Sequence, residues 1–405
     1  MNAPLVSEKR IGRQFVFSLA LAVFGTGMLD VLSSLFLIDI ANTFLGDSNL
    51  ASIAIVSQVV TISSIAAVVF GVLNGFLSVR VNHKKLLLLG VLFIIIGTVG
   101  CYLAPSLVYM GIFYPFDGAG TIIVTAMAFT LVGESLPFEK RGKSIGIVTA
   151  GGVISSAVGF AVAGYIVAFG GWRSYLLWYV LPISFIAIGL AYASIPSEQR
   201  HNQSLEKDSL LSGFKEVLTN KSAAACLFSY TLGGVAAMWA FFAATFWMKQ
   251  FYIEIQYVGL ISLATILLHA AGNILGGRMI DFIGRKPLAV TSWTARGLLL
   301  AAIVFMPDFW SALAISCIFM FVAGISVTSG HCLNVEQVHK SKGTMMSLSM
   351  VFGYLGASLG AAFGALVLGL YGFQVLAITF GSLNLAGAIT ILFFARDPTQ
   401  VSRKN

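Results

Sequence analysis

Twelve apolar stretches constrain the fold of this chain more than any other feature of its sequence. They cover approximately residues 14–42, 50–77, 86–104, 106–133, 144–168, 174–194, 224–248, 256–280, 287–306, 309–332, 344–370 and 373–395. An α-helix of about 18 residues or more crosses a hydrocarbon layer about 30 Å thick. The 405 residues are 58% hydrophobic and 10% charged, which does not describe the surface of a soluble protein. We therefore predict an all-α membrane protein with 12 transmembrane helices.

The basic residues predict the orientation of the chain. Of the 24 Lys and Arg, 21 lie in the two termini and in every second connection between predicted helices. Because basic residues favour the cytoplasmic side, we expect both termini in the cytoplasm and the protein in the plasma or inner membrane. The first stretch is too long for a signal peptide and is interpreted as a retained helix. No separate basic domain remains to bind nucleic acid.

A polar linker divides the chain into two halves of six predicted helices. The expected domains are 1–194, a cytoplasmic linker 195–222, 223–396 and a cytoplasmic tail 397–405. Apolar residues recur in the linker at helical spacing, which predicts a short amphipathic helix on the membrane surface. They are Leu210, Leu211, Phe214, Val217 and Leu218.

The two halves are copies of one unit, offset by 202 residues. The segment "NGFLSVRVNHKK" at 74–85 has the spacing of "GGRMIDFIGRKP" at 276–287, but Val79 replaces Asp281 and Asn82 replaces Gly284. Matching positions are Gly75 and Gly277, Lys84 and Lys286, and Glu134 and Glu336. Two parallel six-helix bundles are typical of transporters that work by alternating access.

The repeated loop resembles the signature loop of the major facilitator superfamily. Its residues here are Gly277, Asp281, Gly284, Arg285 and Lys286. The segments 136–147 and 170–176 also resemble that family. The resemblance implies two parallel six-helix bundles, a monomer, and contact of Asp281 with the start of the fifth helix, near Gly142–Ile145, as a cytoplasmic latch. Its counterpart Val79 cannot form such a latch, so we expect the first loop to act mainly through its cations and lipid headgroups.

The first helix narrows the resemblance to one type of transporter. The segment "FGTGMLDVLSSLFLIDIA" at 24–41 is similar to the first helix of drug and sugar efflux proteins, with Asp30 as the acid of that pattern. This implies proton-coupled efflux of a neutral or cationic drug-like compound, sugar or metabolite. Tyr114 stands where many members carry arginine, and Phe160 where the antiporter pattern has proline. Import by symport or uniport therefore stays open.

Two intramembrane acids are the leading candidates for binding protons or solute. Asp30 and Asp117 each lie about half-way along a predicted helix. A carboxylate at that depth is costly and marks a functional candidate, although hydrogen bonding within the bundle is the alternative. Asp39 lies about 13 Å further along the first helix and is expected at the wet outer interface.

Other polar and aromatic residues in predicted helices supply further candidates. His269 could titrate near neutral pH or simply pack. Arg296 is expected to form an ion pair or to extend its head group to the interface. His331 is expected to be hydrated near the end of its helix. Tyr114, Trp239, Asn273 and Tyr354 are further candidates for lining a solute cavity.

Enzymatic motifs do not support a catalytic function. The segment "GKS" at 142–144 has Pro137 where a phosphate-binding loop needs glycine, and no HExxH zinc pattern occurs. Cys101, Cys226, Cys317 and Cys332 show no metal-like spacing. We predict no catalytic residue, metal or cofactor. A membrane sensor that moves nothing is the remaining alternative from another class.

Overall fold

The structure is a computed structural model and describes residues 5–78, 81–136, 138–167, 170–195, 215–338 and 342–397. Those residues form helices joined by short connections, with no strand among them. Each of the twelve predicted apolar stretches is helical in the described chain, so the predicted all-α class is confirmed. Nine described helices are long and apolar enough to cross a membrane.

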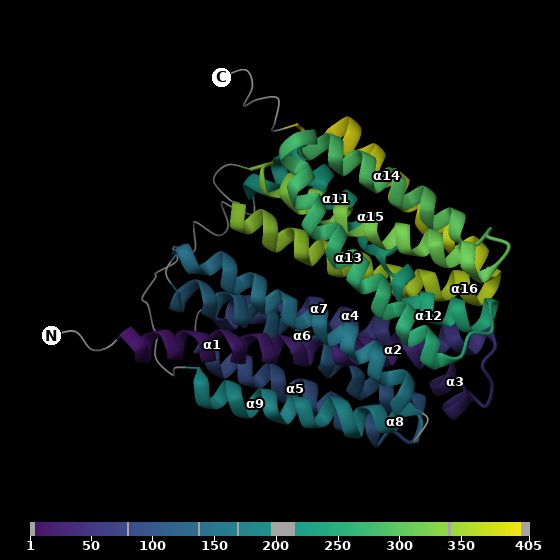
Figure 1. Ribbon diagram of the computed structural model, residues 1–405, viewed down its shortest axis with the longest axis horizontal. Coiled ribbons are helices and arrows are strands. Elements are labelled where there is room, and N and C mark those ends of the chain that lie inside the picture. Colours follow the sequence, from purple (N-terminus) through teal and green to yellow (C-terminus); the bar gives the residue numbers. More distant parts are fainter. Residues whose placement is uncertain are drawn as a thin grey trace. The chain divides into compact units, whose positions relative to one another are not determined.

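The helices fall into two compact units (Figure 1). Unit 1 comprises Met1–Ser48, Ile55–Asn202 and Ile255–Leu260, and unit 2 comprises Asn49–Ala54, Gln203–Glu254 and Ile261–Asn405.

In the first half of the chain the elements are α1 (Leu5–Thr26), α2 (Met28–Leu35), α3 (Leu37–Leu45), α4 (Leu50–Ser78), α5 (His83–Tyr102), α6 (Leu107–Ser135), α7 (Phe138–Ile166), α8 (Trp172–Tyr175), the π-helical turn η2 (Leu176–Val180) and α9 (Leu181–Ser194). In the second half they are α11 (Lys221–Ala237), α12 (Trp239–Gln250), α13 (Ile255–Ile283), α14 (Arg285–Ile303), α15 (Phe309–Val335) and α16 (Lys342–Phe394). The last helix contains a break at Gly372, where φ is 78°. This break separates two of the predicted spans, 344–370 and 373–395.

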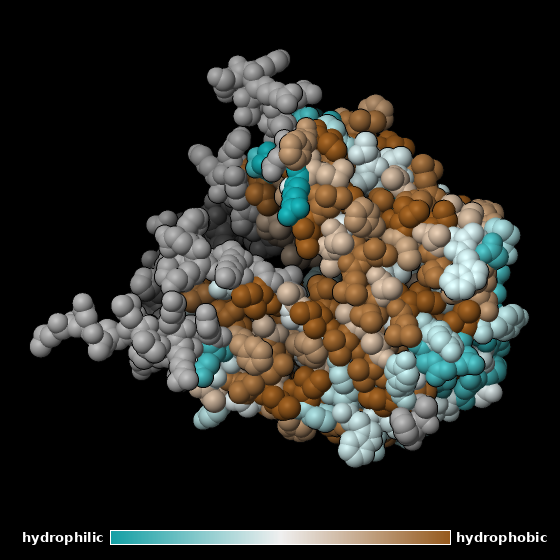
Figure 2. Space-filling view, in the orientation of Figure 1, coloured by the Kyte–Doolittle hydropathy of each residue, from teal (hydrophilic) through white to brown (hydrophobic). Residues whose placement is uncertain are grey.

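Apolar side chains cover most of the described surface on the face shown in Figure 2. Among the exposed side chains are Trp178, Phe282 and Leu366, each more than half exposed. In water such a surface would cause association, whereas a lipid layer accommodates it. The surface therefore agrees with the apolar composition.

Glycine pairs allow neighbouring helices to approach closely. A Cβ atom at Gly120 on α6 would lie 2.5 Å from the carbonyl oxygen of Gly90 on α5. In unit 2, a Cβ atom at Gly297 on α14 would lie 2.8 Å from the carbonyl oxygen of Gly381 on α16. Small residues serve this purpose in membrane helices, where tight van der Waals packing holds the bundle together. These contacts fix the spacing of the helices that carry the buried polar residues.

Candidate functional site

The first predicted span is interrupted twice, on either side of Asp30. Helix α1 ends at Thr26, Gly27 separates it from α2, and Phe36 separates α2 from α3. Asp30 is the third residue of α2, and its side chain lies outside the described part of the structure. A break inside an apolar bundle leaves backbone carbonyl groups that need partners, because no lipid group can donate to them.

Side-chain hydroxyls bond two backbone carbonyls in the first turn of α2. The hydroxyl of Tyr175 donates to the carbonyl of Met28 over 3.0 Å, and the hydroxyl of Tyr114 donates to the carbonyl of Leu29 over 3.2 Å. Both tyrosines are buried. The two accepting carbonyls immediately precede Asp30 in the chain. Residues of α6 and α8 therefore anchor the start of α2, directly before Asp30.

Asp117 lies one helical turn after Tyr114 on α6 and is 3% exposed. Residues three apart are neighbours on a helix surface, and Asp117 interacts electrostatically with the buried Cys101 of α5. Pro115 stands inside α6 between them and removes one backbone hydrogen bond of the helix at this level. Thr121, one turn further on, places its hydroxyl 3.5 Å from the carbonyl of Thr26. The structure thus connects Tyr114 and the region of Asp117 to the interrupted helix.

The π-helical turn Leu176–Val180 follows Tyr175 directly. The ring of Tyr175 stacks on that of Tyr179, with ring centroids 5.2 Å apart. The buried hydroxyl of Tyr179 has no hydrogen-bond partner among the described residues. Turns of this kind occur frequently at functional sites. Tyr175 and Tyr179 were not predicted from the sequence, because a buried tyrosine in an apolar span has no distinguishing pattern.

In unit 2, the structure brings together His269 and Asn273, both predicted candidates. The Nδ2 of Asn273 lies 3.3 Å from Nδ1 of His269, and the hydroxyl of Thr328 donates to Oδ1 of Asn273 over 3.0 Å. His331 is half-buried, with Nε2 2.8 Å from the hydroxyl of Tyr230. Two short polar chains therefore join α13 to α15 and α11 to α15.

The predicted aromatic candidates lie in different surroundings. Trp239 is 3% exposed and packs against Phe246, with ring centroids 5.4 Å apart, within an aromatic cluster of α12. Tyr354 is half-buried on α16. Trp239 is thus buried against an aromatic side chain of its own helix.

The expectation that the head group of Arg296 extends to an interface is wrong. The side chain is 6% exposed, so its head group does not reach an interface. No described acid lies within ion-pair distance of it, and its Nε has no hydrogen-bond partner among the described residues. The reason is its position one turn after Trp293, whose indole points inward and donates to the carbonyl of Ser326. Arg296 therefore faces the interior of the helix bundle.

The signature loop of the second half contains an ion pair between two predicted residues. A guanidinium nitrogen of Arg285 lies 3.0 Å from a carboxylate oxygen of Glu336, and both side chains are about one-third exposed. The pair joins the start of α14 to the end of α15. The side chains of Asp281 and Glu134 and the surroundings of Gly142 lie outside the described part, so the expected latch is not described.

The matching loop of the first half uses its lysine differently from the expectation. The ammonium of Lys84 donates to the carbonyl of Tyr192 over 2.7 Å and lies 5.1 Å from the centroid of that ring. Lys84 is 9% exposed. For this cation the predicted contact with lipid headgroups is wrong, because the ammonium is buried against α9 and donates to the backbone of that helix.

Backbone geometry explains one difference between the two loops. Gly284 has φ 93° and ψ 160°, a conformation available only to glycine, whereas Asn82 has φ −58° and ψ 130°. The side chain of Asn82 instead accepts a hydrogen bond from the amide of Lys84 and caps α5. By contrast, a Cβ atom would fit at both Gly75 and Gly277, because it would meet nothing closer than 4.0 Å.

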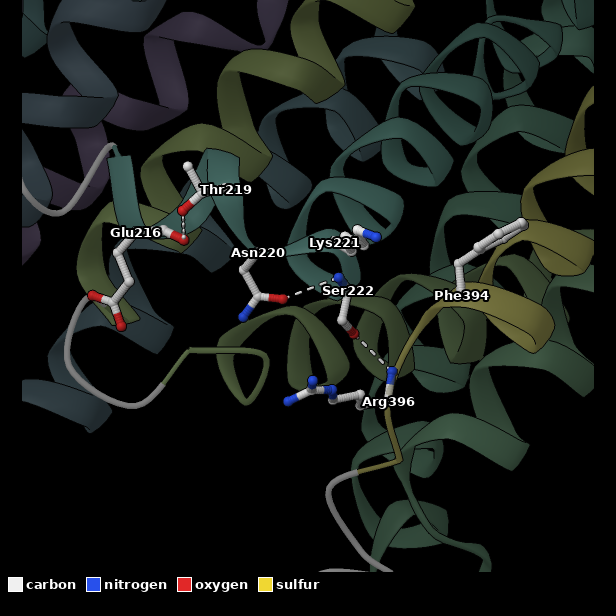
Figure 3. A pocket seen from close by; sticks show the side chains of 7 residues that line it. All are labelled: Glu216, Thr219, Asn220, Lys221, Ser222, Phe394 and Arg396. Atoms are coloured by element: carbon white, nitrogen blue, oxygen red, sulfur yellow. Dashed lines mark hydrogen bonds between the residues drawn. The ribbon is translucent and has the colours of Figure 1, made fainter.

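A pocket of about 440 Å³ lies in unit 2, apart from the predicted candidates (Figure 3). It is lined by Glu216, Thr219, Asn220, Lys221, Ser222, Phe394 and Arg396. The amide of Arg396 donates to the hydroxyl of Ser222, which also bonds Gln337. The end of the linker is helical at 215–219, with Val217 buried and Leu218 exposed; Leu210, Leu211 and Phe214 lie outside the described residues.

Comparison with known proteins agrees with this architecture. The chain is 24% identical to an uncharacterized MFS-type transporter, YceJ, of Bacillus subtilis, over 72% of this chain and 75% of that protein. It is 23% identical to a cis,cis-muconate transport protein of Acinetobacter baylyi, over 72% of this chain and 73% of that protein.

Solved structures share the fold at low sequence identity. A D-xylose–proton symporter superposes with a TM-score of 0.80 at 14% identity, covering 95% of this chain and 98% of that one. A nucleoside transporter, NupG, superposes with a TM-score of 0.75 at 16% identity, covering 95% and 98%. The family model described as Major Facilitator Superfamily matches residues 14–257 and 226–405. The chain is a multi-pass membrane transporter, not an enzyme, and belongs to the Major Facilitator Superfamily.

Proposed function

We propose that this transporter exports a small organic solute in exchange for protons. The observation that carries the proposal is the interrupted first helix. Asp30 lies on the short segment α2, and the two carbonyls before it are held by the hydroxyls of Tyr114 and Tyr175. Discontinuous helices form solute and ion sites in many transporters, because their free backbone groups and side chains face a cavity.

Protons are the coupling ion in this proposal. A carboxylate within a membrane protein is costly when charged, so a site that alternates between wet and dry environments loads and releases a proton readily. Asp30 and Asp117 are the candidate carboxyl groups for this role. Two acids suit a neutral or cationic drug-like compound, sugar or metabolite. Binding of the solute to the charged form would release the proton.

Gating is assigned to the loop between α13 and α14. Asp281 lies near the end of α13, and Arg285, four residues later in the chain, is paired with Glu336. We assign Asp281 to a cytoplasmic latch on the start of α7, near residues 142–145, where helix N–H groups favour a carboxylate. In this scheme both termini are cytoplasmic, the two halves 1–194 and 223–396 rock about the solute, and one copy suffices for transport.

Proton movement in inverted membrane vesicles tests the proposal. Vesicles holding a pH gradient receive a panel of cationic drugs, neutral drugs and sugars, with wild type beside Asp30→Asn and Asp117→Asn. We expect solute-triggered proton release in wild type and its loss in Asp30→Asn. Asp308→Asn is the matched control, because Asp308 lies at an exposed helix start. Solute flux without proton release in wild type would contradict proton exchange.

Import is the second candidate function. Tyr114 stands where the family resemblance places an arginine, and the D-xylose–proton symporter shares the fold. In the same vesicles, an importer that moves solute and proton together would show proton movement in the direction of solute movement. A uniporter would show labelled-solute flux that does not depend on the pH gradient. The three outcomes separate the alternatives.

A further inference from the structure

Arg296 carries a positive charge in the interior of unit 2 that no described residue neutralises. It is 6% exposed, forms no ion pair with a described residue, and its Nε has no hydrogen-bond partner among them. Taking such an ion out of water is costly unless a partner neutralises its charge. A buried charge of this kind is normally paired, and the described side chains do not supply the pair.

A second buried polar group without partners lies at the same level. Asn384 on α16 is fully buried, and neither Nδ2 nor Oδ1 has a hydrogen-bond partner among the described residues. A Cβ atom at Gly297 would lie 2.8 Å from the carbonyl oxygen of Gly381, and one at Gly387 would lie 2.9 Å from the ring of Trp293. Gly297 thus faces Gly381, and Trp293 faces Gly387. Because a lower number on α14 pairs with a higher number on α16, α14 and this part of α16 run antiparallel.

That register places Arg296 and Asn384 at matching heights. Arg296 stands between Trp293 and Gly297, and Asn384 stands between Gly381 and Gly387. Trp293 also contacts Gly233 of α11, where a Cβ atom would lie 2.6 Å from the indole ring. Because Arg296 is one turn from Trp293, its side chain leaves α14 toward the same interior region. Two unsatisfied polar groups therefore lie at the same height within the bundle of unit 2.

The ionisable groups around Arg296 do not provide a negative charge. Tyr230 of α11 and His269 of α13 interact with it electrostatically. The Tyr230 hydroxyl lies 2.8 Å from His331 Nε2, and His269 is bonded to Asn273. A tyrosine and two histidines are neutral or positive at neutral pH. The region is rich in donors and lacks an anion among its described residues.

We infer that Arg296 and Asn384 form a binding site for a small monovalent anion within the C-terminal bundle. One negative charge neutralises the one guanidinium, and a small ion suits an interface of closely packed helices. A halide ion and a carboxylate group share this chemistry, since both accept hydrogen bonds from guanidinium and amide N–H groups. This site is separate from the proposed proton site at Asp30, so either can fail without the other.

Thermal unfolding of the purified full-length protein in detergent tests the site. The unfolding midpoint is measured in gluconate buffer at constant ionic strength, with added chloride, bromide, formate or acetate. We expect a saturable rise of the wild-type midpoint by several degrees. Saturation by halides identifies a resident halide, and saturation by formate and acetate alone identifies the carboxylate group of an organic acid. A midpoint that does not change saturably with any of the four anions overturns the inference.

Variants separate the site from a general salt effect. Arg296→Met replaces the buried charge with an apolar side chain, so we expect it to fold, to equal or exceed wild-type stability without anion, and to lose the anion response. Asn384→Leu is expected to weaken apparent anion affinity about tenfold. Arg173→Gln is the matched control, because the Arg173 guanidinium already bonds the carbonyls of Tyr102 and Ala104. An unchanged response in Arg296→Met, or a response lost equally in Arg173→Gln, overturns the inference.

Discussion

The hydroxyl of Tyr114 on α6 donates a hydrogen bond to the backbone carbonyl of Leu29, 85 residues earlier in the chain. This contact holds a carbonyl group beside the break in the first helix. Tyr114→Phe would remove this side-chain hydrogen bond, at a cost of about 0.5–1.5 kcal/mol. We expect a lower unfolding midpoint and slower solute transport, measured by thermal unfolding and vesicle flux.

Tyr109→Phe is the control for this experiment. Tyr109 lies on the same helix and stacks on Phe113, and its hydroxyl makes no hydrogen bond with the described residues. Loss of the Tyr109 hydroxyl is expected to change neither the unfolding midpoint nor the rate of solute transport. Equal stability and equal flux in Tyr114→Phe and Tyr109→Phe would show that the hydroxyl of Tyr114 does not stabilise the start of α2.

The contact between α5 and α6 predicts a strong effect of adding one methyl group. In Gly120→Ala the new Cβ would lie 2.5 Å from the Gly90 carbonyl oxygen, so the helices must move apart. We expect a loss of about 1–3 kcal/mol, measured as a lower unfolding midpoint. Gly111→Ala on the same helix meets nothing within 4 Å, so it is expected to be neutral or stabilising. If both variants unfold at the same temperature, the close approach is not required.

The matching positions Gly284 and Asn82 of the repeated loop predict losses of stability of different size when glycine is removed or introduced. Gly284→Ala forces a side chain into a glycine-only conformation, with a strain of about 1–3 kcal/mol. Asn82→Gly removes the α5 cap, but glycine at that position costs only a few tenths of a kcal/mol. We expect a clear fall of the unfolding midpoint for Gly284→Ala alone. A larger fall for Asn82→Gly would contradict the assigned backbone conformations.

The start of α15 predicts how its cap responds to pH. Asp308 accepts a hydrogen bond from the amide of Ser311 over 3.0 Å and another from its hydroxyl over 2.8 Å. These bonds lower the pKa of Asp308 from its ordinary value of 3.8. Because the folded pKa is lowered, the cap is fully present above the ordinary value and is lost only as pH falls through the lowered one.

Hydrogen exchange of the first turn of α15 measures this cap. Between about pH 5 and pH 8, we expect protection, corrected for intrinsic exchange, to be constant. Asp308→Ala is expected to increase exchange at residues 309–312, while Asp308→Asn keeps an acceptor and stays close to wild type. Protection that falls between pH 8 and pH 5 in wild type would contradict the lowered pKa.

Much of the architecture follows from the sequence because its signals are local. Apolar runs of sufficient length predict helices wherever they occur, and all twelve predicted stretches are helical in the described chain. The repeat and the loop at 277–286 identified the family, which the family model confirms. The ion pair of Arg285 and Glu336 joins two residues that the repeat had already singled out.

The tertiary structure decided which side of each helix faces the interior. In a membrane protein the outer surface is apolar too, so hydrophobic periodicity does not distinguish a lipid-facing residue from a buried one. Thus Lys84 is buried against α9 and Arg296 points into its bundle, contrary to expectation. Hydrophobic periodicity also gives no sign of the tyrosine hydroxyls that bond carbonyls of the interrupted first span. They meet its carbonyls only because packing brings residues 85 and 147 positions apart into contact.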